Sequence, residues 1–218
     1  MNKTIECNAI LFDLDGVLID SSACIERHWQ RWAAQHGLDM ADVMRVAYGR
    51  RTEETIQLVA PHLQAEEEAR LLEESEAGDT RGVLPGEGAL TLLNSLPVDA
   101  WAIATSGTRA VATSRLKHTG LPIPNILVTA EDVTRGKPDP EPYLIAAKRL
   151  GIPADRCVVV EDAPAGIEAA WAAGMRSVAI ASTHPPQALV KATIIARQLG
   201  DIHVEAGSNH HLAIRVDV

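Results

Sequence analysis

Two aspartates that lie two positions apart are the first residues in the chain that could do chemistry. Asp13 and Asp15 directly follow the short apolar run Ala9–Phe12, and Gly16 follows them. In an extended segment, side chains two positions apart point to the same face, so both carboxylates can reach one site. Carboxylates placed in this way can attack an electrophile, exchange a proton or bind a cation.

Other polar groups follow other apolar runs along the chain. They are Thr105-Ser106-Gly107 after Trp101–Ala104, Gly136-Lys137-Pro138 beyond Ile126–Val128, and Glu161-Asp162 after Val158–Val160. Each group alone could be a helix cap or a turn. Together they indicate a site, because ligands in a doubly wound fold bind beyond the carboxyl ends of the parallel strands. Two acidic clusters at that edge would repel each other without a cation, and ligand sets made only of oxygen favour Mg²⁺.

The elements that would position these groups alternate along the chain. Apolar runs of strand length are expected at Ala9–Phe12, Trp101–Ala104, Ile126–Val128, Val158–Val160 and Val178–Ile180. Their continuous apolar character is typical of parallel strands buried on both faces. Helices are expected between them, near Gly88–Ser95, Arg109–Thr119, Pro142–Leu150 and Gly166–Ala173. This order predicts an α/β fold with a doubly wound, mostly parallel sheet.

One region interrupts the alternation, and the chain ends differently again. Between the first two strands the pattern predicts only helices, at Ser21–His36, Asp39–Val46, Thr52–Val59 and Glu66–Glu76. We therefore expect a catalytic core of residues 1–19 and 84–218, with residues 20–83 inserted as a helical cap domain. A terminal hairpin is expected from Ile202–Ala206 and Leu212–Val216, with its turn at Gly207-Ser208-Asn209.

Composition excludes several classes of protein. The formal net charge of the 218 residues is −9 and no run of Lys or Arg exceeds two, so we expect no nucleic-acid partner. The three cysteines are widely spaced and odd in number, which favours reduced thiols over a disulfide framework. No apolar stretch has the length of a membrane span or a signal peptide. These features predict a cytoplasmic protein without a membrane partner, either a monomer or a small homo-oligomer.

The ordered motifs resemble those of a known superfamily. Asp13-Leu14-Asp15-Gly16-Val17, Thr105, Lys137-Pro138 and Glu161-Asp162 are similar to the motifs of the haloacid dehalogenase superfamily of phosphatases, whose core is Rossmann-like. The inserted helices resemble the cap of one of its subgroups. The stretches "WAIATSGTR", "GKPDPEPYL" and "VVVEDAPAGI" most resemble phosphatases of glycerol 3-phosphate, 2-deoxyglucose 6-phosphate and hexitol phosphates. The resemblance covers nearly the whole chain and implies a small phosphorylated sugar or polyol as substrate.

The resemblance also implies roles for the carboxylates and the lysine. Asp13 would be the nucleophile that forms an aspartyl-phosphate, and Asp15 the general acid that then serves as general base. Lys137 would neutralise charge on the nucleophile and the phosphoryl group. Asp13 and Asp162 would bind Mg²⁺, Asp15 would add its backbone carbonyl, and Glu161 would bind directly or through water.

Substrate binding is expected from two further segments. The Thr105 hydroxyl and the amides of Ser106 and Gly107 would hold the phosphoryl oxygens near a helix N-terminus. In the cap, the stretch Tyr48–Glu53 resembles the cap loop of the sugar and polyol phosphatases. Arg50 would reach the phosphate or a substrate hydroxyl there, unless it pairs with a nearby glutamate on the surface.

Four alternatives have discriminating positions. Dehalogenases lack the second aspartate, here Asp15, and phosphonate hydrolases use a cap lysine, whereas Ser21–Glu76 contains none. A catalytically inactive regulatory member would have lost one of the aspartates, yet all are present. A β-phosphoglucomutase-type phosphosugar mutase remains the alternative. Mutases of this type carry a histidine where this chain has Ile25, although His28 could compensate.

The remaining cap side chains are expected to have structural roles. Trp29 and Trp32 lie three positions apart on one helix, a spacing more typical of a cap core than of a sugar-stacking platform. His28 and His36 are expected at the surface.

Overall fold

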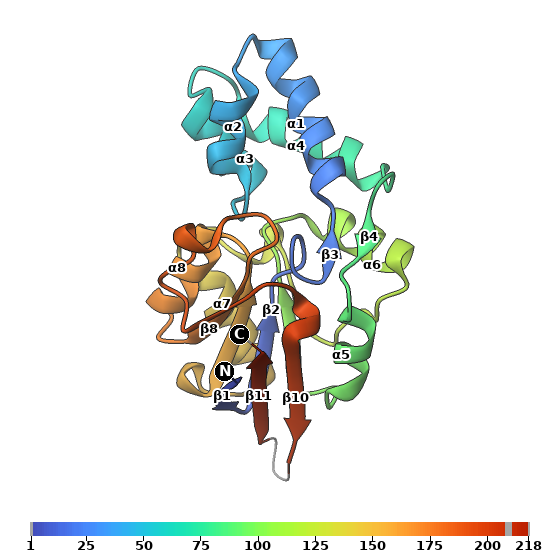
Figure 1. Cartoon of the computed structure of the whole chain (residues 1–218). Coiled ribbons are helices and arrows are strands. Elements are labelled where there is room, and N and C mark those ends of the chain that lie inside the picture. The colour runs from blue at the N-terminus through green and yellow to red at the C-terminus, as the bar shows by residue number, and fades with distance from the viewer. Residues whose placement is uncertain (1, 208–210, 218) are drawn as a thin grey trace.

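The computed structural model describes residues 2–207 and 211–217 and shows two stacked parts (Figure 1). The lower part holds the main sheet, and the upper part is formed by helices α1 to α4. The strand β2 points toward the upper part. The helical part therefore stands over the carboxyl end of the sheet, where the polar motifs were expected to gather.

The main sheet contains six parallel strands in the order β6-β5-β2-β7-β8-β9. Their bounds are β2 Ala9–Phe12, β5 Trp101–Ala104, β6 Leu127–Val128, β7 Cys157–Glu161, β8 Arg176–Ile180 and β9 Ile194–Ala196. This order confirms the predicted doubly wound fold. It also makes β2 the strand from which the sheet grows in both directions, the place where such folds bind ligands. The sixth strand, β9, was not predicted.

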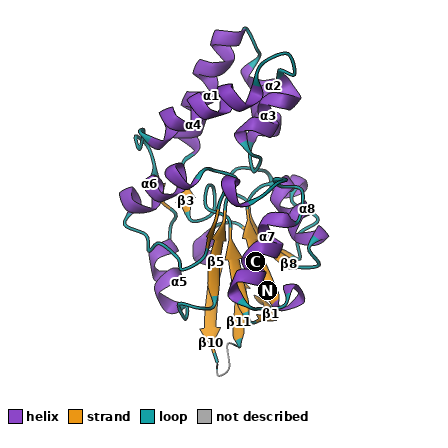
Figure 2. Cartoon of the chain, turned by 180° about the vertical axis from the view of Figure 1, so that it is seen from behind, coloured by secondary structure: helices purple, strands orange, loops and turns teal. Residues whose placement is uncertain are grey.

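Helices cover both faces of this sheet (Figure 2). Alternate residues of the strands pack on α5 and α6 on one face and on α7 and α8 on the other. The helices are α5 Ala89–Ser95, α6 Arg109–Thr119, α7 Glu141–Leu150 and α8 Pro164–Ala172, with short 3₁₀ helices at Ala130–Asp132, Ala154–Arg156, Pro186–Ala188 and Leu199–Asp201. Burial of both faces explains why the strands are continuously apolar.

The inserted region forms a helical cap with its own core. Its helices are α1 Ser22–His36, α2 Met40–Ala47, α3 Thr52–Val59 and α4 Ala65–Ala77. Trp29 and Trp32 are 4% and 3% exposed and pack edge to face at 5.3 Å between ring centroids, which confirms them as cap core. The two chain segments that enter and leave the cap pair as short antiparallel strands, β3 Ile19–Asp20 and β4 Leu84–Pro85. The predicted boundaries of the cap, residues 20 and 83, lie at this pair, and we retain them as a proposal.

A second, antiparallel sheet joins the two ends of the chain. Its order is β1-β11-β10, with β1 Asn2–Cys7, β10 Ile202–Ala206 and β11 Leu212–Asp217. The predicted hairpin is confirmed by the pairing of β10 with β11, while its turn residues Ser208 and Asn209 lie outside the described residues. The participation of β1 was not predicted. Ile214 and Val216 pack into the core cluster on the α5 side of the main sheet.

All three cysteines are buried and free, as expected for reduced thiols. Within residues 2–207 and 211–217, no helix combines the length and apolar character needed to cross a membrane.

Candidate active site

The carboxyl end of β2 places Asp13 beside a buried lysine. The Asp13 side chain is nearly buried, and Lys137 is wholly buried. The Lys137 ammonium donates to Asp13 Oδ1 at 2.5 Å and to Glu161 Oε1 at 2.8 Å. Asp13 and Lys137 are 124 positions apart in the sequence. The fold therefore brings together three residues that were predicted from separate strand ends.

Three carboxylates form an acidic cluster around this lysine. One oxygen from each of Asp13, Glu161 and Asp162 lies within 4.8 Å of the others. Burial raises the pKa of Asp13 to about 7 despite the opposing charge of Lys137, and burial also raises the pKa of Asp162 well above its usual range. One ammonium group can balance only one of the three carboxylates once they are ionised. An all-oxygen set of this kind fits a divalent metal ion.

Within this acidic cluster, both carboxylate oxygens of Glu161 already accept hydrogen bonds. Glu161 Oε1 accepts from Lys137 and from the Tyr143 hydroxyl at 3.0 Å, while Oε2 accepts from the amides of Asp162 and Ala163 at 2.7 and 2.8 Å. Glu161 therefore holds the lysine in place. Tyr143 lies within the quoted stretch "GKPDPEPYL", but no role was predicted for it.

The Asp15 carboxylate lies apart from this cluster and faces the cap. Its Oδ1 accepts from the Ser21 hydroxyl and from Arg115 Nη1, each at 2.7 Å. The other end of the Arg115 guanidinium reaches Glu76 on the cap helix α4 at 3.3 Å. No role was predicted for Ser21, Arg115 or Glu76. Any contribution of the Asp15 backbone carbonyl to a metal site stays a prediction.

The loop after β5 lies opposite Asp13, as expected. Thr105 is nearly buried, and its Oγ1 accepts from the amide of Gly107 at 3.1 Å. The Ser106 hydroxyl donates to the backbone carbonyl of Gly49 at 2.9 Å, which ties this loop to the connection between α2 and α3 of the cap. Phosphate binding by Thr105, Ser106 and Gly107 stays a prediction, with all three residues in the wall of the same pocket as Asp13.

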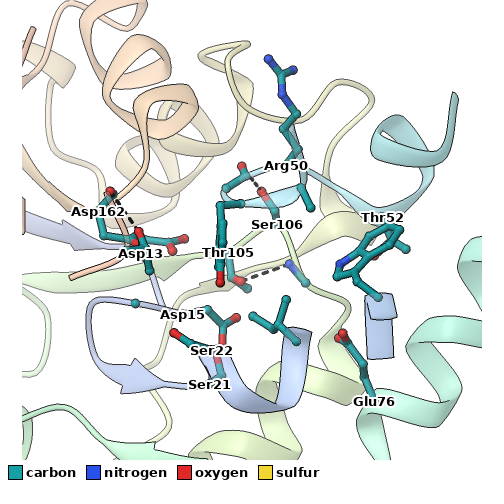
Figure 3. Close-up of a pocket in the computed structure, with 18 of the residues that line it drawn as sticks. Asp13, Asp15, Ser21, Ser22, Arg50, Thr52, Glu76, Thr105, Ser106 and Asp162 are labelled. Atoms are coloured by element: carbon teal, nitrogen blue, oxygen red, sulfur yellow. Dashed lines mark hydrogen bonds between the residues drawn. The ribbon is translucent and has the colours of Figure 1, made fainter. Parts of the chain in front are cut away.

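This pocket lies between the core and the cap (Figure 3). Its wall combines the carboxylates Asp13, Asp15 and Asp162 with cap residues that include Ser22, Ile25, Trp29, Tyr48 and Glu76. Asp13, Thr105 and Asp162 lie on one side of Asp15, and Ser21 and Glu76 on the other. The pocket thus has a charged, core-derived half and a mixed polar and apolar, cap-derived half.

The two adjacent arginines of the cap loop, Arg50 and Arg51, behave differently. Arg50 belongs to the pocket wall, but Figure 3 shows its guanidinium turned away from Asp13 and Asp162. Arg51 pairs with Glu54 at 2.6 Å and donates to the carbonyls of Val133 and Thr134 in the core. Arg51 therefore links cap and core, and substrate contact by Arg50 stays a prediction.

The prediction for His28 was wrong. This side chain is 3% exposed, and its Nε2 lies 3.2 Å from Asp79 Oδ2 in a contact that also includes Arg27. His36 is only half-buried, with its Nε2 3.0 Å from a Glu68 oxygen. Among the residues that the structure describes, no histidine lines the pocket that contains Asp13.

Gly16 lets the chain turn beside the acidic cluster. Its φ is +83°, and a Cβ atom at this position would lie 2.1 Å from Asp162 Oδ2. We expect Gly16→Ala to lower kcat about 100-fold, since displacement of a site carboxylate by about 1 Å has effects of that size. It would also cost roughly 1–2 kcal/mol of folding free energy for the left-handed backbone.

Gly37→Ala is the matched control for this prediction. Gly37 has a φ of +66°, but nothing lies within 4 Å of the point that an added Cβ atom would occupy, so only the backbone cost applies. Steady-state kinetics and urea unfolding of both variants check the prediction. Equal kcat values in the two variants would show that the contact with Asp162 is unimportant.

Comparison with known proteins agrees with this geometry. The haloacid dehalogenase-like hydrolase family matches residues 10–180, and the chain belongs to that family. It is 39% identical to hexitol phosphatase A of Escherichia coli over 96% of this chain and 99% of that protein. It is also 39% identical to glycerol-1-phosphate phosphohydrolase 2 of Saccharomyces cerevisiae, over 83% of this chain and 77% of the relative. The resemblance inferred from the motifs is therefore confirmed.

Solved structures share the fold. A hydrolase from Pseudomonas syringae superposes with a TM-score of 0.78 at 29% identity, covering 88% of this chain and 94% of that one. β-Phosphoglucomutase from Clostridium difficile superposes with a TM-score of 0.72 at 24% identity, covering 88% and 92%. At that identity the second match shows the fold alone.

Proposed function

We propose that the protein is a Mg²⁺-dependent phosphatase that hydrolyses small sugar or polyol phosphates through an aspartyl-phosphate intermediate. The observation that carries this proposal is the buried pair of Asp13 and Lys137, 2.5 Å apart, next to Asp162, with Asp13 and Asp162 in the wall of a pocket. A carboxylate with a lysine bound to one oxygen is oriented to attack with the other. The resemblance to named phosphatases supports the same chemistry.

In the first displacement, an Asp13 carboxylate oxygen attacks phosphorus and the bond from phosphorus to the sugar oxygen breaks. Asp15 donates its proton to the departing alkoxide, which leaves as an alcohol. Thr105 and the amides of the following loop hold the phosphoryl oxygens, whose charge Lys137 offsets. The products of this step are the free polyol and the aspartyl-phosphate.

In the second displacement, a water molecule attacks the same phosphorus atom. Asp15, now a carboxylate, takes one proton from this water, and the bond between phosphorus and the Asp13 oxygen breaks. Inorganic phosphate leaves, and both aspartates regain their starting protonation states. The cap stands over the pocket, where it would keep bulk water from the intermediate.

The acidic cluster is the proposed place of the metal ion. Asp13 and Asp162 would bind Mg²⁺ with their side chains and Asp15 with its backbone carbonyl. The four hydrogen bonds of Glu161 favour contact with the ion through water. When bound, the ion supplies positive charge that stabilises the phosphoryl group during transfer.

Removal of the metal gives a prediction that does not depend on turnover. Mg²⁺ at about 100 times its dissociation constant should raise the free energy of unfolding by about 2.7 kcal/mol. Asp162→Asn should abolish this stabilisation, whereas Asp155→Asn, at an exposed aspartate of the core, should retain it. Urea unfolding with and without Mg²⁺ measures the effect. Equal stabilisation of the two variants would place the ion elsewhere.

The substrate class rests on the relatives and on the cap half of the pocket. The pocket wall contains the hydroxyl-bearing residues Ser22, Tyr48 and Thr52, which suit a polyhydroxyl chain, and the apolar residues Ile25 and Trp29, which suit its carbon backbone. The named relatives act on hexitol and glycerol phosphates, which are substrates of this chemical type.

A mutase must protonate and deprotonate a second sugar hydroxyl as well. Ile25 lines the pocket where the mutase histidine would be, and His28 is turned to Asp79 instead. These positions favour water over a second sugar as the acceptor of the phosphoryl group.

A substrate panel tests the proposal. Phosphate release with Mg²⁺ is measured as kcat/KM for hexitol, aldose, ketose and glycerol phosphates, with β-glucose 1-phosphate included. We expect release from several of these esters and no isomerisation of β-glucose 1-phosphate. Isomerisation without net release would support the mutase, and inactivity toward every ester would overturn the proposed function.

A further inference from the structure

Arg115 is a buried arginine that the proposed mechanism does not use. It lies on α6 in the core, is 2% exposed and forms part of the pocket wall. Burial of a guanidinium is costly unless carboxylates compensate its charge. Two carboxylates do so here, Asp15 at 2.7 Å and Glu76 at 3.3 Å.

The hydrogen bonds from the described residues to the Asp15 side chain all go to one of its two carboxylate oxygens. The Ser21 hydroxyl and Arg115 Nη1 both donate to Oδ1. Oδ2 accepts no hydrogen bond from the residues that the structure describes. With Oδ1 held by two donors that come from different elements, the plane of the carboxylate is fixed and Oδ2 is left for the substrate or water.

Glu76 holds the same guanidinium from the other side of the domain boundary. It lies on the cap helix α4, is 9% exposed and also lines the pocket. The carboxyl groups of Glu76 and Asp15 thus share the guanidinium of Arg115. The guanidinium of Arg115 can therefore orient Asp15 while part of its charge interacts with Glu76. Because Glu76 belongs to the cap, the position of the guanidinium depends on the position of the cap.

We propose that Arg115 is a positioning residue that holds Asp15 ready for proton transfer, and that Glu76 anchors it from the cap. This inference rests on the proposed function. Arg115 reaches Asp15 with one end of its planar fork and Glu76 with the other, a geometry that a lysine cannot reproduce. Through these two contacts, Arg115 makes the position of the catalytic acid Asp15 depend on the position of the cap.

The leaving group distinguishes this role from a merely structural one. A sugar or polyol alkoxide needs the proton of Asp15 in order to leave, whereas p-nitrophenolate leaves without it. Loss of the positioning residue should therefore slow the first displacement, measured as kcat/KM, much more for the alkyl ester than for p-nitrophenyl phosphate. The second displacement, in which Asp15 is the base, is common to both esters. A general loss of folding or of metal binding would slow both reactions equally.

The test compares Arg115→Met with Arg149→Met, which removes an exposed ion pair to Asp132 on the same core. Each variant is assayed with p-nitrophenyl phosphate and with the alkyl phosphate that the wild type hydrolyses fastest. For Arg115→Met we expect kcat/KM for the alkyl ester, which reports the first displacement, to fall on the order of 10- to 100-fold, part of the value of general acid catalysis, and kcat/KM for the aryl ester to fall less than about 3-fold. Arg149→Met should match the wild type for both esters.

Two further variants complete the test. Asp15→Asn should show the same selective loss in kcat/KM, and Arg115→Met should add little in the Asp15→Asn background, because the two residues act as one unit. Glu76→Gln keeps the shape of the anchor and should lower kcat/KM for the alkyl ester by roughly 3- to 10-fold, with no further effect in the Arg115→Met background.

The outcomes separate this inference from the proposed function. A wild type that releases no phosphate from any ester overturns the proposed function. An active wild type with equal losses on the two esters in Arg115→Met overturns the positioning role alone. If circular dichroism shows that Arg115→Met is unfolded, the same comparison of the two esters in Glu76→Gln tests the positioning role instead.

Discussion

Replacement of Asp13 by asparagine is expected to lower kcat by at least about 10⁴-fold, the scale of effect seen when a covalent nucleophile is removed. The amide has nearly the same shape as the carboxylate but cannot form the phosphoryl ester. The measurement is phosphate release at saturating substrate and Mg²⁺, with Asp155→Asn as the control for a substitution at an exposed aspartate.

The stability of the same variant shows whether the loss is chemical. Asp13 is a buried carboxylate whose pKa is raised to about 7 by burial, and Lys137 keeps Glu161 as its partner after the substitution. We therefore expect the free energy of unfolding to change by less than about 2 kcal/mol. An Asp13→Asn variant that folds and retains more than a hundredth of the wild-type kcat would remove Asp13 from its proposed role.

Lys137→Met has the second large expected effect, on both activity and stability. The substitution leaves the Asp13 and Glu161 carboxylates buried without their shared cation. Breaking a buried ion pair in this way costs about 3–5 kcal/mol. Turnover should fall by about 10³-fold, because the phosphoryl group loses a preorganised charge of the kind whose removal costs that much. Steady-state kinetics and urea unfolding measure the two losses.

A double variant separates the two effects of Lys137. Adding Glu161→Gln to Lys137→Met removes one of the uncompensated charges and should restore part of the stability without restoring turnover. Lys191→Met is the surface control, since Lys191 forms an exposed ion pair with Glu168. Near-normal kcat in Lys137→Met would show that the lysine has no part in the chemistry.

The sequence predicted the core of the site because the relevant residues follow strands. Asp13 and Thr105 come directly after an apolar run and Asp162 one residue later, and the geometry of parallel sheets brings such positions together. The same reasoning identified five strands of the main sheet. It missed β9 Ile194–Ala196 and the pair β3 and β4.

The residues that were missed act through contacts between distant segments. Arg115 lies 100 positions from Asp15 and in the middle of a helix, where an arginine is ordinarily exposed. His28 was expected at the surface, yet it is buried because Asp79, 51 positions away, provides its partner at the edge of the cap. Such partners depend on how the cap is seated, and local sequence carries no signal for that.

The stereochemical course at phosphorus tests the central claim most directly. The wild-type enzyme is given a polyol phosphate ester made chiral at phosphorus with oxygen isotopes and sulfur, in isotopically labelled water, and the configuration of the released thiophosphate is determined. Each in-line displacement inverts phosphorus, so attack by Asp13 followed by attack of water predicts overall retention of configuration. Inversion would show that water attacks the substrate in a single step, and would contradict the aspartyl-phosphate mechanism.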